Sequence, residues 1–188
     1  MRVFWRNLSY LVAMAMVLWV GLQPQFTASQ NLTTTTVIST SFEQPIGAPD
    51  INAIYEEVNA QRAAKGLHPL ERNQDLARVA QERAVDMQTK RYYAHQSPTG
   101  DYFYNLLDPV AYNGVYACEN LDLQATLDTQ TYINDWLQSK KGHRECMLNE
   151  AVLQAGYAVA VITLPKVKTN ATMYVVVAIH AATPPDTL

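Results

Sequence analysis

The chain has 188 residues, of which 48% are hydrophobic, with a formal net charge of −3 and a sequence pI near 5.8. This acidic balance, without a block of like charge, excludes a nucleic-acid-binding protein that works through a basic surface. It also excludes a protein that binds membranes through a cationic face.

Residues 1–28 have the pattern of a targeting segment. Arg2 and Arg6 form a basic start, residues 8–22 form an apolar run, and small residues follow. The run is shorter than the about 20 apolar residues that a membrane span needs. We therefore expect cleavage near Ala28 and a secreted chain, with an uncleaved N-terminal membrane anchor as the alternative. Either outcome places the rest of the chain outside the cytoplasm.

The remaining chain divides by composition into three parts. Residues 29–49 are rich in Thr and Pro and poor in apolar residues, which predicts a linker. Residues 50–183 are long enough for one domain with its own core. Residues 184–188 are expected to form a short tail.

Three helices are predicted in this domain. Apolar residues recur at helical spacing over 51–64 and 74–90, each after a capping residue. The third helix is expected over 128–141 and is expected to stop at Gly142. His143 would then follow a helix end directly.

Three strands are predicted, over 116–123, 155–163 and 172–179. The last two are rich in β-branched residues and do not alternate with polar ones, which indicates inner strands covered on both faces. Residues 91–116 are aromatic without periodicity and are interpreted as an ordered loop with short helical pieces. Helices around a small sheet predict a layered α-β-α domain.

The two cysteines of the chain are Cys118 and Cys146. In an exported chain an even pair favours a disulfide. Two buried thiols that pack as small hydrophobic side chains are the alternative. A nucleophilic cysteine has less support, because neither residue lies in a cysteine-protease signature.

Two histidines and one carboxylate in separate segments are candidates for chemistry. His95, Glu119 and His143 are the residue types that form a metal site or an acid–base pair. Their spacing alone does not bring them together.

Four motifs occur in order along the chain. They are His-x-x-Pro-x-Gly from His95, Glu-Asn-Leu from Glu119, Trp-x-x-Ser-x-x-Gly-His-Arg-x-x-Met-Leu from Trp136, and Gly-Tyr-Ala-Val from Gly156. In this order they resemble the CAP superfamily (SCP domain), which includes cysteine-rich secretory proteins, venom antigens, pathogenesis-related proteins and bacterial secreted proteins. The resemblance covers about residues 50–182 and is strongest to the bacterial members.

The resemblance implies an α+β fold, a three-layer α-β-α sandwich (CAP/SCP fold) with a central cleft. It implies that His95, Glu119 and His143 meet in that cleft, where the family has two His and two acidic residues. The second acidic position is Ser139 here, so the set is incomplete. His95 and His143 are the expected ligands of Zn²⁺ or another divalent metal, with Glu119 as a candidate third ligand. The alternative is that both histidines only bond Glu119 and organise the cleft.

The same resemblance implies further properties of the cleft. If its motifs meet there, Cys118 and Cys146 lie close enough to bond, so we predict a disulfide between them. The first functional hypothesis is an extracellular binding module for an unidentified small-molecule, lipid or protein ligand. The second is a metal-dependent, protease-like hydrolase that uses Glu119 and the two histidines, and the third is an interaction domain at the cell surface. The sequence leaves enzymatic activity open.

Overall fold

The computed structural model describes residues 44–107, 116–167, 169 and 171–182. The predicted targeting segment, most of the predicted linker and the whole predicted tail lie outside these ranges, so those boundaries stay predictions. No helix in the described ranges combines the length and apolarity needed to cross a bilayer.

A four-stranded sheet forms the centre of the domain. Its strands stand in the order β1 (Glu71–Arg72), β3 (Gln154–Ile162), β4 (Met173–Ala181) and β2 (Ala117–Gln124). Both β3–β4 and β4–β2 pair antiparallel, while β1 runs parallel to β3. β3 and β4 are buried over nearly their whole length, which confirms them as inner strands. The two-residue β1 was not predicted, because two exposed residues carry no pattern.

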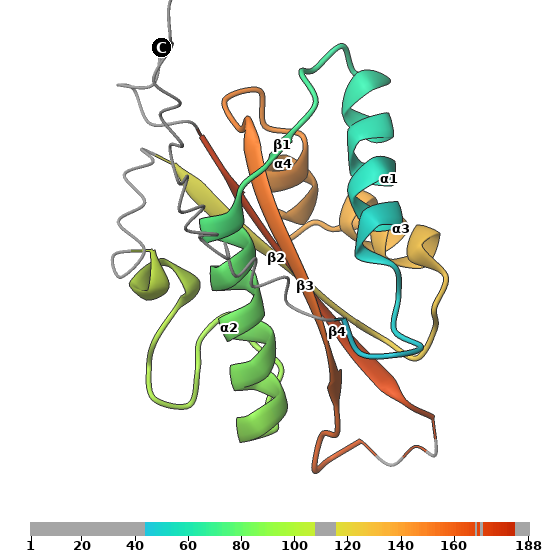
Figure 1. The fold of residues 1–188 in the computed structure, drawn as a ribbon, viewed down its shortest axis with the longest axis vertical. Coiled ribbons are helices and arrows are strands. Elements are labelled where there is room, and N and C mark those ends of the chain that lie inside the picture. The colour runs from blue at the N-terminus through green and yellow to red at the C-terminus, as the bar shows by residue number, and fades with distance from the viewer. Residues whose placement is uncertain (1–43, 108–115, 168, 170, 183–188) are drawn as a thin grey trace, which may run out of the picture. The chain divides into compact units, whose positions relative to one another are not determined.

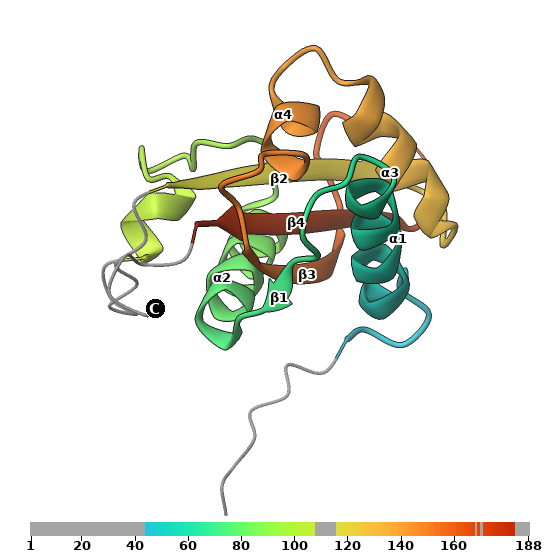
Figure 2. The same ribbon diagram turned by 90° about the horizontal axis from the view of Figure 1, so that it is seen from above.

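Helices cover both faces of this sheet. α2 (Gln74–Lys90) lies on one face, and α1 (Ile51–Ala63), α3 (Thr129–Gln138) and α4 (His143–Met147) lie on the other. Figures 1 and 2 show the three layers from two directions. The predicted three-layer α-β-α sandwich is therefore confirmed. The described part of the aromatic loop includes a short 3₁₀ helix, η1 (Phe103–Leu106), in line with the short helical pieces expected there.

Gly156 explains how closely α2 packs on the sheet. A Cβ atom at this position would lie 2.0 Å from the backbone nitrogen of Ala77 in α2. The helix backbone therefore rests directly on β3, and only glycine leaves room for it. This contact gives a physical reason for the glycine in the Gly-Tyr-Ala-Val motif.

The end of the third predicted helix was wrong. α3 ends at Gln138, and Ser139 is already extended. Gly142 has a φ of 96° and stands at the start of α4, so it begins a short second helix instead of ending the first. His143 is accordingly the first residue of α4.

The side chain of Arg62 links α1 to the chain segment that follows α4. It lies in α1 and is completely buried. Its guanidinium donates hydrogen bonds of 2.7–3.0 Å to four backbone carbonyls, those of His68, Met147, Asn149 and Val152. A buried cation that bonds only carbonyls fixes the chain after α4 against α1.

Candidate functional site

A buried ion pair between Arg83 and Glu119 positions the residues of the candidate site. Arg83 of α2 and Glu119 of β2 have side chains that are 3% and 1% exposed, and Arg83 Nε donates to Glu119 Oε1 over 2.9 Å. The rest of the guanidinium donates to the hydroxyl of Tyr92 and to the carbonyls of Ala94 and His95. One arginine thus positions both the carboxylate and the backbone that carries His95.

His95 is oriented by this carboxylate. Its Nδ1 lies 2.7 Å from Oε2 of Glu119. Because a carboxylate accepts, Nδ1 carries the proton and donates it. In the neutral ring Nε2 then has a free lone pair. Both oxygens of Glu119 are now engaged, one by Arg83 and one by His95.

His143 faces His95 from the other side of β2. Their Nε2 atoms are 3.4 Å apart, and the ring centroids are 5.6 Å apart. Asn120 donates from Nδ2 to the carbonyl of His143, which anchors the start of α4 on β2. Burial, His95 and Lys141 lower the pKa of His143, against an opposing effect of Glu119. These effects favour the neutral form of the His143 ring.

The structure thus brings the three predicted side chains together. His95 comes from the loop after α2, Glu119 from the edge strand β2, and His143 from α4. The two histidines meet across the edge of the sheet, which sequence spacing alone did not require. Their Nε2 atoms lie close together at a place that solvent can reach, because the side chain of His95 is 48% exposed.

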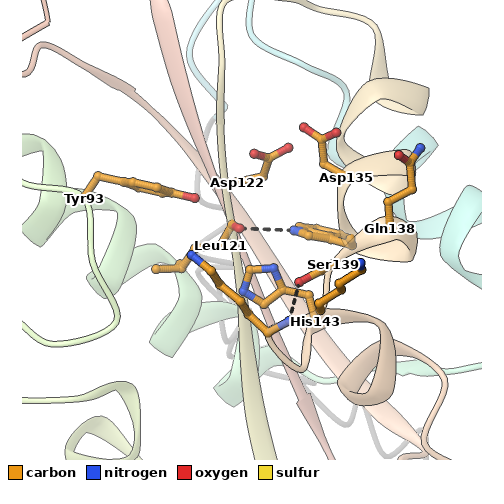
Figure 3. Close-up of a pocket in the computed structure, with 10 residues that line it drawn as sticks. Tyr93, Leu121, Asp122, Asp135, Gln138, Ser139 and His143 are labelled. Carbon is orange, nitrogen blue, oxygen red and sulfur yellow. Dashed lines mark hydrogen bonds between the residues drawn. The ribbon is translucent and has the colours of Figure 1, made fainter.

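An open cavity of about 300 Å³ lies beside His143. It reaches from the loop after α2 to the last turn of α3 and beyond, with Tyr93 on one side and Asp135 and Ser139 on the other (Figure 3). Burial and the neighbouring Asp135 raise the pKa of Asp122, a cavity residue on β2, to about 6. Ser139, which stands where the resemblance expects an acidic residue, lines this cavity and accepts a bond from the backbone nitrogen of Lys141.

The predicted disulfide is present. Cys118 of β2 and Cys146 of α4 are bonded. His180 of β4 lies next to this disulfide, and its two ring nitrogens contact side chains other than the His95–His143 pair. It is fully buried, with Nδ1 3.3 Å from the sulfur of Cys146 and Nε2 2.9 Å from the hydroxyl of Tyr157. Burial, and then Arg62, lower the pKa of His180 to about 3.

A match to a protein-family model establishes the family of this chain. The model of the CAP family, described as the cysteine-rich secretory protein family, matches residues 55–179, more than half of the chain. The chain belongs to the CAP family.

Individual CAP relatives are similar over part of their length. The Bacillus subtilis (strain 168) protein YkwD, itself described as uncharacterized, is 30% identical over 96 residues, which are 51% of this chain and 37% of YkwD. An extracellular protein with an SCP domain from Bacillus anthracis is 25% identical, with a TM-score of 0.55 over 70% of this chain and 39% of that one. An outer surface protein of Borrelia burgdorferi has a TM-score of 0.58 at 20% identity, over 70% of this chain and 91% of that one. The chain therefore spans less than half of the two Bacillus proteins.

Sequence reasoning missed three residues of this CAP site. Arg83 occupies a position on the apolar face of α2, one turn from Val79 and Ala80. A charge at such a position was the available signal, because a buried arginine needs a partner. Asp122 and Asp135 gave no signal, since their proximity depends on how α3 packs against β2.

Proposed function

We propose that this CAP domain is an extracellular binding module in which His95 and His143 hold a divalent metal ion beside a small cavity that charged side chains partly line. The observation that carries the proposal is the 3.4 Å separation of the two Nε2 atoms. Two metal–nitrogen bonds of about 2.0–2.1 Å at a tetrahedral angle place the nitrogens about 3.4 Å apart. The two rings are already spaced for one shared ion.

The surroundings of the histidines fit such an ion. Glu119 accepts from the Nδ1 of His95, and a metal-binding histidine commonly donates its second nitrogen to a carboxylate. This role suits Glu119 better than direct ligation, because neither of its oxygens is free. The lowered pKa of His143 favours the neutral ring, which can present a lone pair to an ion. When bound, the ion would supply Lewis acidity and open coordination positions for a ligand.

The cavity indicates the kind of ligand. Its volume of about 300 Å³ lies at the lower end for small-molecule sites. Its lining combines the carboxylates of Asp122 and Asp135 with Lys140 and Lys141. Charged side chains of both signs along the lining favour a small polar ligand over a long lipid chain, because charged and polar groups can pair with polar groups of the ligand.

Three features support a location outside the cytoplasm. The chain starts with a predicted targeting segment, and it contains a disulfide, which persists mainly in oxidising compartments. It is also similar to an extracellular SCP-domain protein of Bacillus anthracis.

A metal-dependent hydrolase is the second candidate and has less support. A hydrolase would need a free carboxylate to accept a proton from water. Glu119 is 1% exposed in its side chain and is bonded at both oxygens, so it serves as a base only if it releases His95 or Arg83.

Calorimetric titration of metal-free protein with Zn²⁺ tests the metal site. We expect one equivalent of binding in the wild type and its loss in His95→Ala and His143→Ala. His68→Ala is the matched control, since His68 lies exposed in a loop. Zinc binding that survives both site variants would remove the histidine pair from the proposal.

A further inference from the structure

A second group of metal-binding atoms lies around the disulfide, apart from the His95–His143 pair. The sulfurs of Cys118 and Cys146 and Nδ1 of His180 all lie within 4.8 Å of one another. They come from β2, α4 and β4, so the packing of the whole layer fixes them. Cys118 and His180 are directly paired across β2 and β4 and lie on the face that α4 covers.

His180 is held as a metal-binding histidine is held. Its Nε2 contacts the hydroxyl of Tyr157 at 2.9 Å, and both side chains are buried. In the dithiol form, a tyrosine hydroxyl that accepts from Nε2–H would leave the lone pair on Nδ1, the nitrogen that faces the sulfur of Cys146. Such a partner on the second nitrogen fixes the tautomer and the ring orientation of a ligand histidine.

We infer that the dithiol form of this chain binds a borderline or soft divalent ion, such as Zn²⁺, through Cys118, Cys146 and His180. Two thiolates and an imidazole are a known ligand set for Zn²⁺, with a fourth position open to water. Thiolates select such ions over Mg²⁺ or Ca²⁺. The inference does not depend on the proposed function, because it uses none of the same ligands.

A dithiol can reduce the disulfide between Cys118 and Cys146. The reductant gives two electrons and two protons, the bond between Cys118 and Cys146 breaks, and the reductant's own sulfurs become a disulfide. Binding of the ion then releases the two thiol protons. The newly made chain, whose cysteines are still thiols, enters the same state without a reductant.

The fold allows the exchange of a disulfide for an ion. A tetrahedral ion with bonds of about 2.3 Å to sulfur holds two thiolates about 3.8 Å apart, further than two bonded sulfurs. Rotation of the two cysteine side chains supplies this separation, and Cys118 is partly exposed on the edge strand. The ion then does what the disulfide does in the oxidised chain. It keeps α4, and with it His143, on β2.

Absorption during Co²⁺ titration tests the inference, because thiolate ligation of Co²⁺ gives a sulfur-to-metal charge-transfer band that imidazole ligation does not. The titration uses the full chain as the His95→Ala/His143→Ala double variant, so that the first proposed site cannot contribute. We expect the band at one equivalent in the reduced protein and no band in the oxidised protein.

Further variants make each outcome decisive. Cys118→Ser should abolish the band. Tyr157→Phe should keep it but weaken the affinity about 10- to 100-fold, as loss of such a supporting bond does. If the reduced chain unfolds, Co²⁺ should restore its circular dichroism. A reduced chain, folded or not, that shows no thiolate band at saturating Co²⁺ overturns the inference. A band that is unchanged in Cys118→Ser does the same.

Discussion

Replacing Arg83 by methionine tests the foundation of the site. The substitution keeps the unbranched apolar stem of the side chain but removes the guanidinium, and with it the charge that pairs with Glu119. Both side chains are nearly inaccessible, so solvent screening does not weaken the pair. Removing one partner of a buried ion pair costs about 3–5 kcal/mol, because the other charge stays buried without compensation.

The cost is measured as the free energy of unfolding in urea. With an m-value of about 2 kcal/mol per molar, a loss of about 4 kcal/mol lowers the urea midpoint by about 2 M. Arg78→Met is the matched control. Arg78 lies in the same helix, but its side chain is 39% exposed and its contacts with Asp75 and Glu82 are 3.8 and 3.6 Å. Exposed pairs of this kind contribute at most about 1 kcal/mol.

The double variant Arg83→Met/Glu119→Gln separates charge from packing. Removing the unpaired carboxylate should recover part of the stability that Arg83→Met loses. If Arg83→Met costs no more than Arg78→Met, the ion pair does not support the site and the reasoning is refuted.

Three further predictions concern the fold and the cavity. Gly156→Ala should lower the free energy of unfolding by more than about 3 kcal/mol, because its Cβ meets the α2 backbone. Gly66→Ala, at a φ of 70° with free space, should lower it by only about 1–2 kcal/mol, and equal losses in urea or thermal unfolding would contradict this packing. The variant Cys118→Ser/Cys146→Ser removes a disulfide between cysteines that are 28 residues apart in the sequence. The free energy of unfolding of the metal-free protein should fall by about 3–4 kcal/mol, because the unfolded chain gains entropy. An unchanged free energy of unfolding would contradict this argument. Burial raises the pKa of Asp122 to about 6, above its unfolded value near 3.9, so its stability contribution is complete below about pH 4 and is lost as the pH rises through 6. Asp122→Asn should therefore raise the free energy of unfolding by up to about 2–3 kcal/mol at pH 7 and not at pH 4. A gain that does not depend on pH would contradict the assigned cause.

The sequence predicted the parts of this structure that depend on local pattern. Helical spacing placed α1 and α2 within a residue of their ends, and β-branched runs located β3 and β4. The prediction for the end of the third helix was wrong because the backbone is already extended at Ser139 and because glycine with positive φ can either close a helix or open the next one. Gly142 does the second, and nothing in the surrounding residues distinguishes the two.

The site was predictable only through the ordered motifs. Resemblance to a family, not spacing, placed His95 and His143 together. The buried Arg83 that positions His95 and Glu119 was visible only as a charge on an apolar helix face. The link from Cys146 to His180 depends on how α4 lies over β2 and β4, which no local pattern encodes.

The most direct test of the central claim is the anomalous X-ray signal of a crystal grown or soaked with Zn²⁺. The account predicts one strong anomalous peak about 2 Å from Nε2 of both His95 and His143. It also predicts that Glu119 stays bonded to His95 and does not touch the ion. Zinc bound elsewhere, with no peak between these two rings, would contradict the account.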